Sequence, residues 1–191
     1  MEYSMDERCR RMVEECLAIK DIKNPIRIFR KIATKNFIRI HGPEHHILDG
    51  ACFLTAFYNA GGKIDLQAGL ERIVTEGQKM PGATCGLWGV CGSVTSVGAA
   101  LAFIDGTGPL TTDASWGNHM QFTAKALQRM SETGGPRCCK RDAFISLTVA
   151  IEYAKEQYGI LLEMEDITCG FSAKNAQCIK ERCPYYPKRG A

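Results

Sequence analysis

Apolar residues recur at spacings of three and four along most of the chain, which is the period of an amphipathic α-helix. In residues 5–20 this pattern is kept by Met12, Cys16 and Ile19. From residue 138 to residue 158 a longer apolar stripe consists of Phe144, Leu147, Ile151, Ala154 and Tyr158. No series of strand-like segments is recognisable, so the pattern predicts helices.

Residues that favour helix ends show where several of these helices begin and stop. Asn24 is predicted to cap a helix whose first residue is Pro25, and Asp65 to cap one that runs to about residue 79. Gly159 is expected to end the last helix. Further helices are expected from Pro43 to Gly61, over residues 91–105, and from Ser115 to the Gly134-Gly135 pair.

These segments predict an all-α fold, a single-domain bundle of about six to eight helices. In this interpretation residues 1–168 form the helical domain, and residues 169–191 form a short cysteine-bearing tail packed on the same domain. A chain of 191 residues is long enough to bury a substantial core.

Composition changes this picture only through the cysteines. A hydrophobic content of 45%, a charged content of 24% and a net charge of +3 are ordinary for a globular protein, and nucleic acid is an unlikely partner. The sequence has no apolar run of membrane-spanning length and no signal peptide at its start, so we expect a cytoplasmic protein without membrane contact. Ten cysteines in such a chain indicate metal binding or thiol chemistry.

Two of these cysteines flank a glycine-rich turn in "PGATCGLWGVCGS", residues 81–93. Glycine lets the backbone approach a bulky ligand and expose N–H groups, which hydrogen-bond cluster sulfurs or anionic oxygens. Cys85 and Cys91 are therefore candidate metal ligands, and a packed turn with incidental thiols is the alternative. The cysteines inside amphipathic helices are expected to be structural: Cys9, Cys16 and Cys52.

Cys138 and Cys139 are adjacent in "GGPRCCKRD", at an expected helix start. The helix macrodipole favours a thiolate in the first turn. Three neighbouring side chains add positive charge: Arg137, Lys140 and Arg141. Adjacent helical residues point about 100° apart, so one thiol can face a site while the other faces the core or a second ligand. We predict metal-binding or reactive thiols here, with two buried structural thiols as the alternative.

The tail "CGFSAKNAQCIKERCPYYP" carries three more cysteines, Cys169, Cys178 and Cys183. A short segment with little apolar material needs a staple to hold a fold, and thiolates around a metal supply one. The third cysteine precedes a proline, as in some iron–sulfur ligand runs, whereas the spacing fits no zinc-finger pattern. We therefore predict metal binding in the tail and leave the metal open.

Three of the four histidines lie in "HGPEHH", residues 41–46. In the first turn of a helix the dipole disfavours the imidazolium, so His45 and His46 should be neutral rings able to ligate or to exchange a proton. Glu44 and Asp49 are placed to orient these rings. The alternative is a satisfied helix cap with solvent-facing rings. His119 is expected to be a core or surface residue.

The segments "HGPEHHILDGACFLTAFYNAGG", "PGATCGLWGVCGS", "GGPRCCKRDAF" and "CGFSAKNAQCIKERCPYYP" together resemble an uncharacterised cysteine-rich domain family of anaerobic bacteria and archaea. Its members often occur fused to, or beside, S-adenosylmethionine-dependent methyltransferases, so the resemblance implies a methyltransferase as partner. The sequence contains no methyltransferase part and would be the free-standing form. A weaker similarity to the helical C-GCAxx-C-C redox family covers only Cys85, Cys91 and the glycines around them.

Our first hypothesis is an iron–sulfur protein, with a 4Fe-4S cluster, that performs redox or sulfur-transfer chemistry as an oxidoreductase or sulfurtransferase. The residues assigned to catalysis are His45, His46 and Cys139. Those assigned to holding the cofactor or an anionic small-molecule substrate are His41, Arg137, Lys140 and Arg141. The metal ligands are expected among Cys85, Cys91, Cys138, Cys139, Cys169, Cys178 and Cys183, in one site or two.

Two other hypotheses stay open. The first is a zinc-stapled helical accessory module for a methyltransferase, without catalysis of its own. The second is thiol-only redox chemistry, with a reversible disulfide between distant cysteines. A redox partner protein is a further expected partner, and the small-residue helix at residues 92–102 permits a homodimer.

Overall fold

The chain folds into eight α-helices with no strand among residues 2–188, which are the residues that the computed structural model describes. The all-α prediction is therefore confirmed. The α-helices are α1 (Met5–Ala18), α2 (Pro25–Ala33), α3 (His45–Asn59), α4 (Leu66–Gln78), α5 (Thr84–Leu87), α6 (Gly92–Ile104), α7 (Asn118–Thr133) and α8 (Cys139–Tyr158). Three short 3-10 helices lie at Ala114–Gly117, Ser172–Lys174 and Lys180–Arg182.

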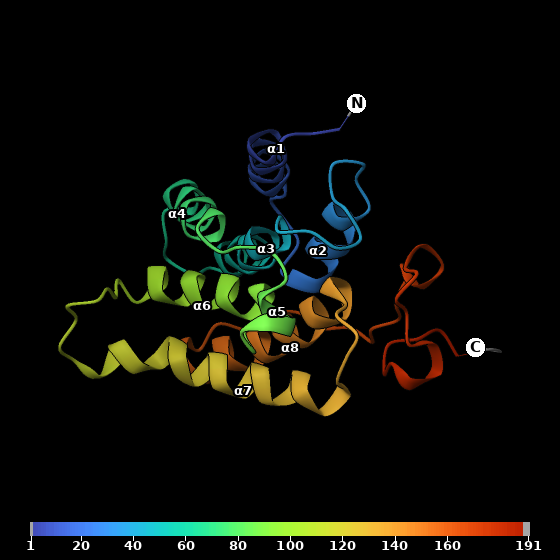
Figure 1. The fold of residues 1–191 in the computed structure, drawn as a ribbon. Coiled ribbons are helices and arrows are strands. Elements are labelled where there is room, and N and C mark those ends of the chain that lie inside the picture. Colours follow the sequence, from blue (N-terminus) through green and yellow to red (C-terminus); the bar gives the residue numbers. More distant parts are fainter. Residues whose placement is uncertain (1, 189–191) are drawn as a thin grey trace.

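Helix α3 is the centre of the fold, and helices α1, α2, α4, α6 and α8 pack around it (Figure 1). Its residues from His45 to Phe57 are all buried, as expected of a helix that is surrounded on every side. The approach to α6 is closest at Gly50, whose backbone N–H donates to Ser96 Oγ over 2.9 Å. A β-carbon on Gly50 would lie 2.4 Å from the Ser96 carbonyl oxygen, so only glycine fits there.

Several predicted helix ends are confirmed by their caps. The side chain of Asn24 accepts hydrogen bonds from the first backbone N–H groups of α2, and that of Asp65 accepts one from Ala68. Gly159 ends α8 in the left-handed conformation, with φ at 65°.

Two helix starts differ from the prediction, and one short helix is additional. Helix α3 begins at His45 rather than at Pro43, and α7 begins at Asn118, after a 3-10 turn that Asp113 caps. The glycine-rich turn contains a short helix, α5, that the sequence pattern did not predict. A four-residue helix is too short to show an apolar period, so the pattern carries no signal for it.

The tail beyond α8 packs on the same helices (Figure 1). The ring of Phe171 meets that of Phe29 on α2 at 6.5 Å between centroids, and Tyr185 meets Phe144 on α8 at 5.3 Å. The backbone N–H of Cys169 donates to the Tyr185 carbonyl over 2.7 Å. These few contacts hold a segment whose only helices are two 3-10 turns.

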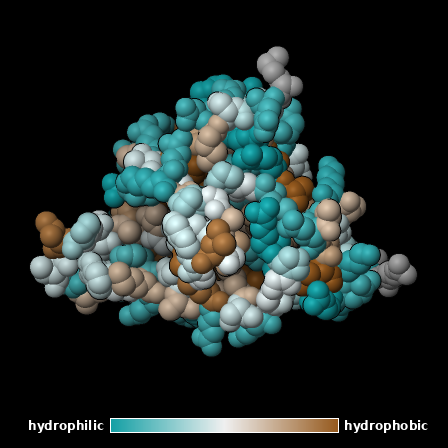
Figure 2. Space-filling model, viewed as in Figure 1, coloured by the Kyte–Doolittle hydropathy of each residue, from teal (hydrophilic) through white to brown (hydrophobic). Residues whose placement is uncertain are grey.

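The surface combines polar side chains with a few large apolar ones. Figure 2 shows hydrophobic side chains in the middle of the face where α5 lies in Figure 1. Leu87 at the end of α5 and the following Trp88 are 76% and 65% exposed. In the described part of the chain, no helix combines the length and apolarity needed to cross a membrane.

Candidate thiol and metal sites

Seven of the ten cysteines line two separate pockets that meet at the start of α8. Cys138 lines the first pocket together with the tail cysteines, Cys169, Cys178 and Cys183. Its neighbour Cys139 lines the second pocket together with Cys85 and Cys91. The two adjacent thiols thus belong to different sites, because consecutive positions of a helix point in different directions. The other three, Cys9, Cys16 and Cys52, are buried in the hydrophobic core.

The first pocket, called the tail pocket below, is a cavity of about 20 Å³ between α8 and the tail. Backbone N–H groups point at three of its four sulfurs. Phe171 N donates to Cys169 Sγ and Lys180 N to Cys178 Sγ, both over 3.4 Å. Cys138 Sγ, at the N-cap of α8, accepts from Arg141 N over 3.5 Å and from Asn175 Nδ2 over 3.4 Å. Such donors stabilise a thiolate over a thiol.

The second pocket, called the thiol–histidine pocket below, is a cavity of about 60 Å³. Besides three cysteines it is lined by His45, His46, Arg137 and Asp142. Three helices begin at it, because His45 is the first residue of α3, Cys91 is the N-cap of α6, and Cys139 is the first residue of α8. The positive ends of three helix dipoles therefore face one small space.

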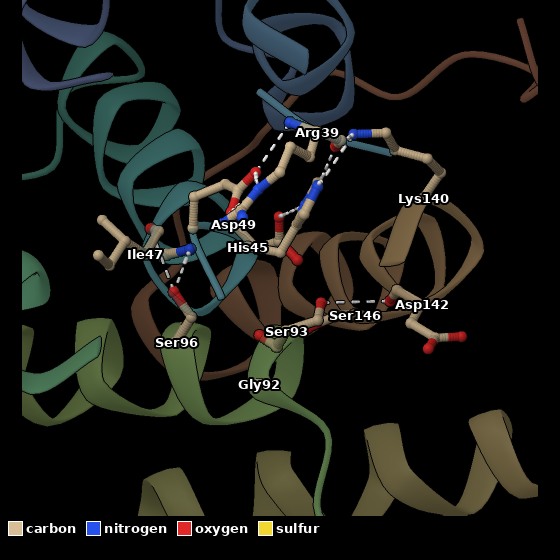
Figure 3. Close-up of polar contacts among 12 residues, drawn as sticks. Arg39, His45, Ile47, Asp49, Gly92, Ser93, Ser96, Lys140, Asp142 and Ser146 are labelled. Carbon is tan, nitrogen blue, oxygen red and sulfur yellow. Dashed lines mark hydrogen bonds and ion pairs between the residues drawn. The ribbon is translucent and has the colours of Figure 1, made fainter. Parts of the chain in front are cut away.

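Behind this pocket lies a buried charge network that Figure 3 draws. The side chain of Lys140 is 1% exposed, and its Nζ donates to the Arg39 carbonyl and to His45 Nε2, each over 3.0 Å. On the other side of the ring, His45 Nδ1 lies 3.9 Å from Asp49 Oδ1. Neither Asp49 oxygen has a hydrogen-bond partner in the structure. Burial lowers the pKa of Lys140 to about 8.

Lys140 and Arg141, two of the positive side chains near the two thiols, have other partners in the structure. Lys140 points into the network behind the pocket, and Arg141 pairs with Asp142 at 3.3 Å. Burial outweighs every nearby cation and raises the pKa of Cys138, and that of Cys139 to about 12. Burial therefore favours the neutral thiol form of both side chains. The sequence does not indicate that Lys140 is buried, because burial of a lysine in the first turn of a helix depends on which distant segments pack over it.

Two histidine expectations are also corrected. His41 does not line the thiol–histidine pocket, because its Nε2 hydrogen-bonds Asn175 Oδ1 in the tail at 2.9 Å. Glu44 does not orient a ring, because both of its carboxylate oxygens bind Arg39, the closest contact being 2.7 Å to Nη2. His45 and His46 do lie in the first turn of α3, and burial lowers the pKa of His46.

The Arg39–Glu44 pair predicts a pH dependence of stability. Burial alone would raise the pKa of Glu44, but hydrogen bonds from the Arg39 side chain and backbone lower it to about 2, from an ordinary value of 4.5. A lowered carboxyl pKa adds stability above pH 4.5 that is lost as the pH falls from 4.5 towards 2. We expect Glu44→Gln to cost about 2 kcal/mol at pH 7, and the difference from wild type to shrink below pH 4.5, as measured by urea unfolding. A difference that is the same at pH 7 and pH 3 would contradict this.

A larger hollow of about 1000 Å³ lies among α4, α6, α7 and the loop after α6. It is lined mainly by apolar and small side chains, with His46 and His119 among them. His46 also lines the thiol–histidine pocket, so this residue borders both spaces.

Fold and site define an all-α protein with two cysteine-lined pockets at the start of one helix. Among residues 2–188, no group of three or more cysteine, histidine or acidic side chains stands in positions that could hold a metal ion. The chain belongs to DUF5714, a family of unknown function, whose sequence profile matches residues 12–186. No curated protein and no solved structure is significantly similar to the chain.

Proposed function

We propose that this protein is a metal-binding protein in which Cys138, Cys169, Cys178 and Cys183 hold one metal ion. The observation that carries the proposal is the convergence of these four thiols, from α8 and from three points of the tail, on a single cavity. Four thiolates are a common ligand set for zinc and for iron. Backbone N–H groups at three of the sulfurs favour the thiolate form that a metal requires.

The size of the cavity favours a single ion over the 4Fe-4S cluster. A volume of about 20 Å³ holds roughly one water-sized sphere, whereas a four-iron cluster is much larger. The tail also needs a staple, because its two 3-10 turns contribute few buried residues. The alternative hypothesis from the sequence is a zinc-stapled accessory module for a methyltransferase. Such a module requires a metal site of this kind in the tail.

Metal analysis of anaerobically purified protein tests the proposal. We expect Cys178→Ala and Cys183→Ala each to lose one equivalent of zinc or iron relative to wild type, while the core variant Cys9→Ala loses none. Removing the ion should also expose residues 159–188 to limited proteolysis, with the helical content unchanged in circular dichroism. Unchanged metal content in both tail variants would overturn the proposal. If the protein contains acid-labile sulfide in proportion to iron, the site holds an iron–sulfur cluster and not a single ion.

A further inference from the structure

The thiol–histidine pocket is chemically separate from the tail pocket and uses different residues. Cys85 comes from α5, Cys91 from the N-cap of α6, Cys139 from the first turn of α8 and His46 from the first turn of α3. We propose that these four side chains form a second metal site, for a thiophilic divalent cation such as Zn²⁺. Three thiolates and one imidazole are a known zinc ligand set.

The imidazole of His46 is held as a metal ligand would be. Its Nδ1 lies 3.3 Å from the Met80 carbonyl oxygen, to which it donates as a neutral ring. This leaves the lone pair on Nε2, since among the described residues only Nδ1 of this ring has a hydrogen-bond partner. A carbonyl on the second nitrogen is the usual way in which a protein orients a ligating histidine. Gly92 makes room for the ring, because a β-carbon there would lie 2.4 Å from Nε2.

The three cysteines lie on different elements: Cys85 on α5, Cys91 at the N-cap of α6 and Cys139 on α8. Cys91 is buried, with its Sγ 3.8 Å from Asp142 Oδ2, and Cys139 is fixed by the first turn of α8. Cys85 and Cys139 are both partly buried, but Cys85 lies on a four-residue helix, so it is the side chain that we expect to turn inward. The cavity of about 60 Å³ is larger than one ion needs and admits it with part of its water shell.

A separate observation that supports the site is a buried polar group in the pocket without a partner among the described residues. Thr84 lines it, is 2% exposed, and its buried hydroxyl oxygen has no hydrogen-bond partner in the structure. The preceding Ala83 adopts the left-handed conformation, with φ at 68°, which is strained for a residue with a β-carbon. A bound ion with a coordinated water would give the Thr84 hydroxyl a hydrogen-bond partner. It would also account for the strained backbone at Ala83 in the same turn.

Electrostatics favours a metal thiolate over an empty pocket. Three thiolates and one divalent cation carry a net charge of −1, and three helix N-termini face this charge. Each thiol gives up its proton to solvent when its sulfur binds the ion, so no redox partner is needed. Burial raises the pKa of Cys91 and Cys139, so each of these thiols releases a proton when its sulfur binds the ion.

Anaerobic titration of the metal-free, full-length protein with Co²⁺ tests both sites separately. Wild type should bind two equivalents with sulfur-to-cobalt charge-transfer absorbance. The adjacent cysteines are matched controls, because Cys138→Ala should lose only the tail equivalent and Cys139→Ala only the second. His46→Ala should weaken only the second equivalent, by at least tenfold, and change its spectrum. Cys9→Ala should keep both.

The outcomes distinguish the two proposals. If Cys139→Ala and the partly exposed Cys85→Ala both keep every equivalent that wild type binds, the second site is overturned and the tail site stands. If Cys138→Ala keeps every equivalent while Cys139→Ala loses one, the tail site fails alone. Cys85→Ala changes a short surface helix, so it stays informative even if Cys139→Ala does not fold.

Discussion

Replacing Gly50 with alanine is expected to lower the free energy of unfolding by about 2 kcal/mol or more. Helix propensity favours alanine by about 1 kcal/mol in a helix interior, so propensity alone predicts stabilisation. The new β-carbon, however, would lie 2.4 Å from the Ser96 carbonyl oxygen and 2.7 Å from Ser96 Oγ. Backbone cannot move aside as a side chain can, and overpacking costs about 1–3 kcal/mol or more. The clash between α3 and α6 should therefore outweigh helix propensity, so that the substitution lowers the free energy of unfolding.

The measurement is urea or thermal unfolding of Gly50→Ala beside Gly117→Ala. Gly117 has an ordinary helical backbone, and a β-carbon there would meet nothing within 4 Å. The control should be neutral or slightly stabilised, whereas Gly50→Ala should lower the melting temperature by roughly 5–10 °C. Equal stability of the two variants would show that α3 and α6 do not approach as closely as described.

Replacing Lys140 with methionine is expected to destabilise the protein by about 3–5 kcal/mol. Methionine has a similar length and fills the site, so the loss comes from charge and hydrogen bonding rather than from a cavity. The Arg39 carbonyl and His45 Nε2, which lie 3.2 Å apart, would lose the Lys140 donor, and the buried Asp49 side chain would lose a nearby cation. A buried charge left without compensation costs several kcal/mol.

A second substitution separates this mechanism from loss of packing. Asp49→Leu removes the carboxylate, so the double variant Lys140→Met/Asp49→Leu should lose less than the sum of the two single losses, by at least about 1 kcal/mol. Lys125→Met is the matched control, since Lys125 is a surface residue that pairs with Glu152 at 3.3 Å, and its loss should stay below about 1 kcal/mol. Additive losses, or equal losses in Lys140→Met and Lys125→Met, would show that no buried charge network exists. All of these variants are unfolded in the presence of a chelator, so that a bound metal does not contribute to the measured stability.

Much of the fold could be predicted because helix formation is largely a local property. The caps at Asn24, Asp65 and Gly159 depend on residue types and on the backbone within one turn, so the sequence shows them directly. The start of α7 was misplaced because Asp113 caps a 3-10 turn first. Helix α5 follows a strained left-handed alanine, which no sequence pattern favours.

The candidate residues could also be named from sequence, but not grouped. Cysteines beside glycine turns and at helix starts are recognisable by residue type, and this applies to Cys85, Cys91 and the adjacent pair. Their division into two pockets follows from the direction of each side chain on α8 and from where the tail lies, which are long-range properties. For the same reason His41 was assigned to the wrong neighbours.

The sequence by itself determined that this protein is helical, where most of its helices end, and which sulfur and imidazole side chains are the candidates for chemistry. Only the tertiary structure decided that Lys140 is buried, that neighbouring thiols serve different cavities, and that Asp49 lies without a hydrogen-bond partner behind one of them. The physical reason is that helix periods and caps act within a few residues. Desolvation and charge compensation, in contrast, depend on segments that lie far apart in the chain.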